Sequence, residues 1–319
     1  MIVTLTTNPS LDRTAALGSP LQRGALHRLG EVTIEPGGKG VNVARCIQLA
    51  GESVLAVLPA APRDQILTLL EIRGIPFSAV DVAPAVRTNL TLTEPDGTTT
   101  KLNEPGGELS ALELNALRGA LLVAAQRAQW VVLSGSLPPG APVDFYVDLV
   151  RALRPMKVKI AVDTSDAPLL AIARALPAAA PDLLKPNSDE LAQLTGADAK
   201  ELEERAEAGD LAPVLEAGRN LVEQGVGSVL ATLGAAGAVL VTAEGAWSAT
   251  PPQIVPRSTV GAGDSSVAGF VLAQASGGSP ADCLRNAVAY GAGATALAGT
   301  AVPAPQQTDP DGVTITQIA

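Results

Sequence analysis

Residues 258–269 read Ser-Thr-Val-Gly-Ala-Gly-Asp-Ser-Ser-Val-Ala-Gly, and an apolar run follows them. The glycines Gly261 and Gly263 before Asp264 predict a tight loop that opens into a buried helix. Backbone N–H groups at a helix start have no partner within the helix and attract an anion such as phosphate. A carboxylate there opposes anion binding by its charge, so we interpret Asp264 as a group that takes a proton. The alternative is an ordinary glycine-rich turn in which Asp264 is the N-cap of the next helix.

A second glycine-rich loop lies at residues 35–44, which read Glu-Pro-Gly-Gly-Lys-Gly-Val-Asn-Val-Ala and also lead into a helix. This loop lacks the frame of a Walker A motif and the Gly-x-Gly-x-x-Gly frame of a dinucleotide site. Lys39 can nevertheless pair with a phosphate, and Asn42 can hydrogen-bond a hydroxyl group. A helix-start loop with a solvated lysine is the alternative.

Three further segments carry polar groups suited to a ligand. Asp12 follows the first expected strand and can accept bonds from two vicinal sugar hydroxyls, although an aspartate that forms a turn is the commoner case. Asn187 and Glu190 lie three residues apart at an expected helix start, which suits Mg²⁺ held through water or, equally, a helix cap. Residues 232–237, Thr-Leu-Gly-Ala-Ala-Gly, form either a tight turn or a backbone surface that a nucleotide can approach.

Segments rich in β-branched residues alternate with helical segments along the chain. The expected strands are residues 2–6, 53–58, 130–134, 158–163, 228–232 and 238–242. The expected helices are residues 41–50, 111–128, 144–153, 188–194 and 214–224. This alternation predicts a single α/β domain over residues 1–319, with a largely parallel sheet flanked by helices on both faces. Ligands in such folds bind beyond the carboxyl ends of the strands.

Two segments, residues 12–36 and 86–103, do not follow this alternation. The turn Pro95-Asp96-Gly97 joins two alternating strands in the second segment, which is the pattern of a β-hairpin. We expect both segments to form a small antiparallel β lid that stands off the main domain. The last nine residues, 311–319, are expected to be a short strand or a frayed tail.

Composition excludes several classes of function. The net charge is −10, which argues against nucleic acid or an anionic membrane as partner, because both require a basic surface. One histidine, His27, and two cysteines, Cys46 and Cys283, are too few for a zinc site or a catalytic triad. Two distant cysteines are typical of reduced core residues, and the chain starts on a strand with no leader or bilayer-spanning run. A cytoplasmic protein is expected.

Five motifs in order cover essentially the whole chain: Asn-Pro-x-Leu-Asp, Gly-Gly-Lys-Gly-x-Asn, Ser-Gly-Ser-Leu-Pro, Lys-Pro-Asn-x-x-Glu and Gly-Ala-Gly-Asp-Ser. Together they resemble the ribokinase-like, PfkB-type family of carbohydrate kinases. The resemblance implies a ribokinase-like fold and phosphoryl transfer from ATP to a sugar phosphate. Lys39 and the segment 98–106 resemble the members that phosphorylate fructose 1-phosphate at O6, giving fructose 1,6-bisphosphate by in-line transfer.

The resemblance also implies a role for each motif residue. Asp264 would be the base, and Gly261, Ala262 and Gly263 would supply the N–H groups of an anion hole. Sugar and sugar phosphate would be held by Asp12, Gly38, Lys39, Asn42, Arg87, Lys101 and Ser136. The nucleotide would lie against Lys185, Asn187, Thr232, Gly234, Gly237 and Asn286. Asn187 and Glu190 would orient Mg²⁺ through water.

One departure from the family bears on the choice of sugar. Residues 59–64 read Pro-Ala-Ala-Pro-Arg-Asp where the family has a glycine-rich loop, so the sugar cleft is expected to differ. Tagatose 6-phosphate and fructose 6-phosphate are therefore alternative substrates. A silent sugar-phosphate sensor is disfavoured because a pure binder has no use for Asp264, and an oxidoreductase lacks its fingerprint. The alternating hairpin also leads to the hypothesis of a homodimer through the lid.

Overall fold

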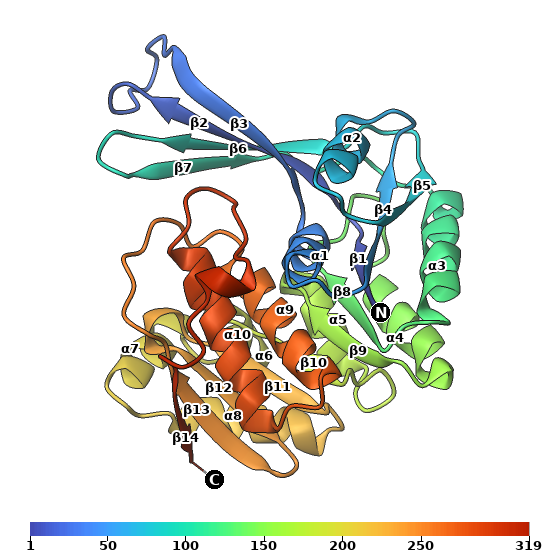
Figure 1. The fold of residues 1–319 in the computed structure, drawn as a ribbon. Coiled ribbons are helices and arrows are strands. Elements are labelled where there is room, and N and C mark those ends of the chain that lie inside the picture. The colour runs from blue at the N-terminus through green and yellow to red at the C-terminus, as the bar shows by residue number, and fades with distance from the viewer. Residues whose placement is uncertain (319) are drawn as a thin grey trace.

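A computed structural model describes residues 1–318, and its core is a ten-stranded sheet in the order β14-β13-β12-β11-β10-β9-β8-β1-β4-β5 (Figure 1). Its strands are β1 Ile2–Thr6, β4 Val54–Ala60, β5 Phe77–Asp81, β8 Trp130–Ser134, β9 Lys159–Asp163, β10 Leu183–Leu184, β11 Ser228–Thr232, β12 Ala238–Thr242, β13 Gly245–Thr250 and β14 Thr314–Gln317. Pairing is parallel from β5 to β11 and antiparallel from β11 to β14. The expected largely parallel sheet is confirmed, and its final strand falls within the segment predicted as a strand or a tail.

Helices cover both faces of this sheet, as the alternation predicts. They are α1 Lys39–Leu49, α2 Gln65–Ile72, α3 Ala111–Ala125, α4 Phe145–Leu153, α5 Asp166–Arg174, α6 Ser188–Thr195, α7 Ala199–Glu207, α8 Ala212–Glu223, α9 Ala262–Ala275 and α10 Pro280–Thr295, with 3₁₀ turns at Arg154–Met156, Gly234–Ala236 and Pro305–Gln307. One face packs against α1, α9 and α10, and the opposite face against α3, α4 and α5. No helix within residues 1–318 is long and apolar enough to cross a bilayer.

All six predicted strands and all five predicted helices occur, with ends within three residues of the structure. Helix α10 is the longest element that the sequence pattern did not predict, with 16 residues of which ten are buried, and the other missed elements are short or only partly buried. Strand β10 has two residues, and β5 has no fully buried side chain. Helix α2 begins after Asp64, whose carboxylate caps Ile66 N–H at 3.2 Å. Such elements carry too few apolar positions to establish a period.

The lid is a second, four-stranded sheet in the order β3-β2-β6-β7 that projects from the main domain (Figure 1). Its strands are β2 Ser10–Leu17, β3 Leu29–Gly37, β6 Arg87–Thr93 and β7 Thr99–Asn103. The outer pairs are antiparallel as predicted, but the central β2–β6 pair is parallel. This correction follows from the chain path, because β2 and β6 both leave the main sheet in the same direction.

Register divides the lid into a polar and an apolar face. Asp12 is paired with Asn89, whereas Ala15 is paired with Leu92 on the opposite face. The polar face is turned toward the main domain. Thr14, two residues after Asp12 and on the same face of β2, lies next to Gly299 of the main domain, where an added Cβ would be 3.5 Å from Oγ1 of Thr14. The polar face of the lid therefore lies over the carboxyl edge of the main sheet.

Candidate active site

Asp264 lies in the first turn of α9, at the carboxyl edge of the main sheet. Gly261 is the N-cap with φ 77°, a left-handed conformation that favours glycine. The predicted loop is shorter than expected, because Ala262 and Gly263 are already helical. No side chain caps this helix, so the alternative of Asp264 as N-cap is wrong.

The start of α9 presents unpaired N–H groups. Among residues 1–318, the N–H groups of Gly261, Gly263 and Asp264 have no hydrogen-bond partner, and that of Ala262 reaches only Thr259 O at 3.4 Å. A phosphate oxygen is the kind of group that such a helix start attracts. The structure therefore contains the helix start with unpaired N–H groups that the glycines predict, and anion binding there stays a prediction.

The carboxylate of Asp264 is buried, with 6 % of the residue exposed. Its Oδ2 accepts a hydrogen bond from Nδ2 of Asn42 at 2.9 Å. Burial, reinforced by the negative charge of Asp163, raises the pKa of Asp264 to about 6, although Lys39 and Asn42 act in the opposite direction. At neutral pH the carboxylate is therefore ionised, yet much more basic than an exposed aspartate. That is the property a proton acceptor needs.

Two lysines from distant parts of the chain share one carboxylate beside this base. Lys39 Nζ lies 3.1 Å and Lys185 Nζ 3.2 Å from the same oxygen, Oδ1 of Asp163. Glu190 lies farther away, 3.8 Å from Lys39 and 3.6 Å from Lys185. Burial alone would raise the pKa of Asp163, but the two lysines hold it below its ordinary value. Burial would lower the pKa of Lys39, and the charges of Asp163, Asp264 and Glu190 outweigh this effect and raise it.

Asp163 is a site residue that the sequence analysis missed. The available signal was its place at the end of the predicted strand 158–163, where a ligand site is expected in a parallel sheet. Its neighbours across the strands, Ser134 and then Thr6, lie in register with it. Oδ2 of Asp163, Oγ of Ser134 and Oγ1 of Thr6 are buried without a hydrogen-bond partner among residues 1–318. This row of polar atoms lies at the ends of strands β1, β8 and β9.

Asn187 and Glu190 form the cap that was the alternative to a metal site. Oδ1 of Asn187 accepts from Glu190 N–H, and Oε2 of Glu190 accepts from Asn187 N–H, both at 2.8 Å. Within residues 1–318 no group of three or more His, Cys, Asp or Glu side chains could hold a metal ion directly. These residues fit Mg²⁺ only through water, with the free Oδ2 of Asp163 as a further acceptor.

The other residues predicted to bind the nucleotide differ in how open their surroundings are. Thr232 forms a parallel bridge with Asn187, so these two strand ends are adjacent. A Cβ on Gly234 would meet nothing within 4 Å, whereas a Cβ on Gly237 would lie 2.0 Å from the carbonyl oxygen of Ala249. The close packing of β13 is therefore sufficient to require glycine at position 237, and the nucleotide role of Gly237 stays a prediction. Asn286 Nδ2 donates to Asp282 O, one turn earlier in α10.

The predicted sugar residues lie between the lid and the first glycine loop. Asp12 belongs to lid strand β2, not to a turn, and its Oδ1 accepts from Ser10 Oγ at 2.7 Å and from Asn89 Nδ2 at 3.0 Å. Asn89 is thus a second residue that the sequence analysis missed. Gly38 has φ 104°, and a Cβ there would lie 2.6 Å from a side-chain carbon of Thr6. Glycine is therefore required for the loop to pack against the end of β1.

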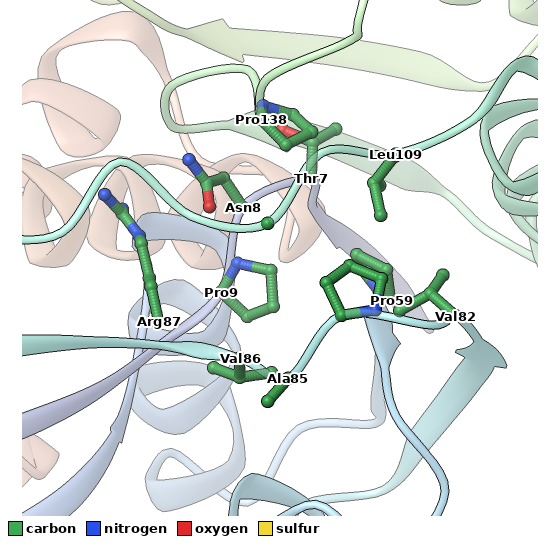
Figure 2. A pocket seen from close by; sticks show the side chains of 12 residues that line it. Thr7, Asn8, Pro9, Pro59, Val82, Ala85, Val86, Arg87, Leu109 and Pro138 are labelled. Carbon is green, nitrogen blue, oxygen red and sulfur yellow. The ribbon is translucent and has the colours of Figure 1, made fainter.

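The three cationic side chains expected at the sugar phosphate, Arg87, Lys101 and Lys39, do not lie together in the structure. Arg87 extends from the start of β6 toward Asn8 across a small cavity (Figure 2), and its Nη1 donates to Glu104 O at 3.0 Å. Lys101 is exposed on β7, and Ser136 is exposed after β8. The ammonium group of Lys39, predicted to join Arg87 and Lys101, instead lies beside Lys185 at Asp163.

The atypical segment 59–64 contributes to the same cavity. Pro59 lies near the end of β4 and lines the cavity with Val82, Val86 and Arg87 (Figure 2). Asp64 caps α2 with one carboxylate oxygen and accepts from Val86 N–H with the other, at 2.8 Å. The segment therefore holds Val86, the residue directly before Arg87, in place. The unusual sequence of residues 59–64 thus affects the shape of the cavity that Val86 and Arg87 line.

Comparison with known proteins places these features in context. The model of the pfkB family of carbohydrate kinases matches residues 6–307. A 1-phosphofructokinase of Xanthomonas campestris is 37 % identical over 274 residues, 85 % of this chain and 83 % of that protein. The ATP-dependent 6-phosphofructokinase isozyme 2 of Escherichia coli is 33 % identical over 303 residues, 94 % of each. The crystal structure of phosphofructokinase-2 from Escherichia coli in complex with potassium superimposes with a TM-score of 0.87 at 30 % identity, covering 96 % of both chains.

Proposed function

Because the chain belongs to the pfkB family of carbohydrate kinases, we propose that it transfers a phosphoryl group from ATP to O6 of fructose 1-phosphate. The observation that carries this proposal is a buried, basic carboxylate, Asp264, at a helix start with unpaired N–H groups. Six curated 1-phosphofructokinases besides the Xanthomonas protein are 32–35 % identical to this chain, and this supports fructose 1-phosphate as the acceptor.

Asp264 accepts the proton of the attacking 6-hydroxyl group in the proposed reaction. The N–H groups of residues 261–264 hold an oxygen of the phosphoryl group in transfer. Lys39 and Lys185 stand beside that group, so we assign both to its negative charge, whereas Arg87 and Lys101 hold the phosphate already on the sugar. Phosphoryl transfer depends mainly on such positioning and charge stabilisation, because its transition state is loose.

Asp12, Gly38, Asn42 and Ser136 remain assigned to the sugar side. Thr232, Gly234, Gly237 and Asn286 remain candidates for the nucleotide side, together with Lys185 and Asn187. Mg²⁺, held through water by Asn187 and Glu190, would neutralise charge on the nucleotide phosphates when bound. ATP as donor and two buried free cysteines fit the cytoplasm, which we propose as the compartment.

The substrate is tested by measuring ADP release with fructose 1-phosphate, fructose 6-phosphate and tagatose 6-phosphate at equal concentrations. We expect the highest kcat/KM with fructose 1-phosphate. The 33 % identity to a 6-phosphofructokinase makes fructose 6-phosphate the second candidate. Activity with either 6-phosphate and none with fructose 1-phosphate would refute the first choice while leaving a sugar-phosphate kinase in place.

The pKa of Asp264 predicts the acid limb of the pH profile. A base must be deprotonated to accept a proton, so activity is present above pH about 6 and is lost as the pH falls through that value. Below it, kcat/KM is expected to fall about tenfold per pH unit. Direct measurement of ADP between pH 4.5 and 8 checks this, without pH-sensitive coupling enzymes. A profile flat down to pH 4.5 would contradict the assignment.

The apolar face of the lid supports a homodimer, which we propose as the assembly. It presents Leu29, Val32 and Leu102, which are 45 %, 37 % and 55 % exposed, next to the buried Leu17 and Leu92. A second copy of the same face would remove these side chains from water. Light scattering at micromolar concentration is expected to give a dimer, and Leu102→Lys a monomer. A wild-type monomer would contradict the proposal.

A further inference from the structure

Arg45 connects three parts of the molecule that are far apart in sequence. It belongs to α1, the helix that follows lid strand β3 (Figure 1), and is only 8 % exposed. Its Nη2 donates to Oε2 of Glu35 on lid strand β3 at 3.1 Å. Its Nη1 lies 3.2 Å from Thr300 O, in the segment after α10, and 3.4 Å from Oδ1 of Asn42. This guanidinium group has no part in the reaction proposed above.

The contact with Asn42 bears directly on Asp264. Asn42 and Arg45 lie three residues apart on one face of α1. Guanidinium groups only donate and an ionised carboxylate only accepts, so the Asn42 amide satisfies both neighbours in a single orientation. Its oxygen faces Arg45, and its Nδ2 faces Oδ2 of Asp264 at 2.9 Å. Without Arg45, the Asn42 oxygen would lose its donor in a residue that is only 4 % exposed.

Glu35 brings the lid into this chain of contacts. It is paired with Asp12 across strands β2 and β3, so the anchor of Arg45 lies beside a residue proposed to hold the sugar. Glu35 is also bound by Arg73, which follows α2 and whose Nε lies 3.1 Å from Oε2. Among residues 1–318, Arg73 makes no hydrogen bond to Asn42 or Asp264. Both arginines therefore bind the carboxylate of Glu35. Of the two, Arg45 also contacts Asn42, which is hydrogen-bonded to Asp264.

We propose that Arg45 is a positioning residue that couples the lid to the catalytic base. Sugar held under the lid fixes strand β3 and Glu35, Glu35 fixes Arg45, and Arg45 holds the Asn42 amide against Asp264. The coupling presupposes the proposed role of Asp264 as base. It predicts that Arg45 affects turnover through Asn42 and not by a separate route.

A double-mutant cycle tests this route. Arg45→Met is expected to lower kcat about 10- to 100-fold, the effect of misplacing a reacting group, with KM for ATP changed less than about threefold. In an Asn42→Ala background the same substitution is expected to change kcat less than about twofold, because the group it acts through is already gone. Equal losses in both backgrounds would overturn the coupling.

Milder variants keep the test valid if Arg45→Met does not fold. Arg45→Lys keeps a donor and a positive charge and is expected to recover part of kcat. Glu35→Gln removes only the lid anchor and is expected to lower kcat about three- to tenfold. Its matched control, Arg73→Met, removes the other partner of Glu35 and is expected to leave kcat within about twofold. Equal losses in Glu35→Gln and Arg73→Met would also overturn the coupling.

Asp264→Asn separates failure of the coupling from failure of the proposed function. Normal turnover of that variant would refute the base, and the coupling with it. Loss of turnover in Asp264→Asn with an additive Arg45 and Asn42 cycle would refute the coupling alone.

Discussion

Replacing Asp264 with asparagine is expected to lower kcat by about 10²- to 10⁴-fold, the range for loss of a positioned general base. Asparagine has the same shape and can still accept the hydrogen bond from Asn42, so the site is expected to keep its geometry. KM for both substrates should therefore change little, which locates the loss in the transition state. Steady-state kinetics with ATP and fructose 1-phosphate check this. Near-normal turnover would refute the assignment.

The same substitution is expected to raise stability at neutral pH. The pKa of Asp264 is about 6 in the folded protein against 3.8 for an exposed aspartate, so the folded state binds the proton more tightly. Burying the ionised carboxylate therefore costs stability above pH 6, by up to about 3 kcal/mol, and nothing below pH 3.8. Thermal unfolding of Asp264→Asn should show a higher Tm than wild type at pH 8 and no gain at pH 4. A lower Tm at pH 8 would contradict the raised pKa of Asp264, because that pKa already includes the opposing effects of Asn42 and the lysines.

Replacing Asp163 with alanine has the second-largest expected effect. Its Oδ1 is the nearest counter-charge of both Lys39 and Lys185, and the residue is only 1 % exposed. Its removal leaves Lys185, itself 3 % exposed, with Glu190 at 3.6 Å as its one remaining ion-pair partner among residues 1–318. Loss of one partner from a buried ion pair costs about 3 kcal/mol. We expect kcat to fall at least about 10²-fold as well, because both ammonium groups lose their position.

A surface ion pair provides the matched control. Asp210 lies 2.7 Å from Arg205, closer than either lysine lies to Asp163, but both side chains are more than 40 % exposed. Asp210→Ala is expected to destabilise the protein much less than Asp163→Ala, because water already solvates both charges. Urea unfolding of both variants gives the comparison. Equal stability losses would contradict the importance of burial at Asp163.

Local sequence was sufficient to predict most of the fold. The six predicted strands and five predicted helices depend on periods and caps within about ten residues, which a single segment contains. The helix start at Asp264 was predictable for the same reason, since Gly261 and Gly263 act on their own backbone. Short elements such as β10 were missed because they form only against their neighbours.

The partners of the charged residues were not predictable in the same way. Lys39 was expected at the sugar phosphate, but Asp163, 124 residues away, holds it beside Lys185. Asn42, assigned to the sugar, also donates to Asp264, 222 residues away, which the sequence did not indicate. The packing of Gly237 against the carbonyl of Ala249, which leaves no room for a Cβ, was likewise not visible in the sequence. Each of these outcomes depends on which strand ends lie side by side.

The sequence by itself determined most of the elements, the two glycine loops and the choice of Asp264 as the proposed base. Only the tertiary structure decided how strongly basic that carboxylate is and what holds it in place. The physical reason is that secondary structure and caps arise from neighbours along the chain, whereas burial and charge pairing act through space. Asp264 is raised to a pKa of about 6 by burial and by Asp163, and neither cause can be read from residues 258–269.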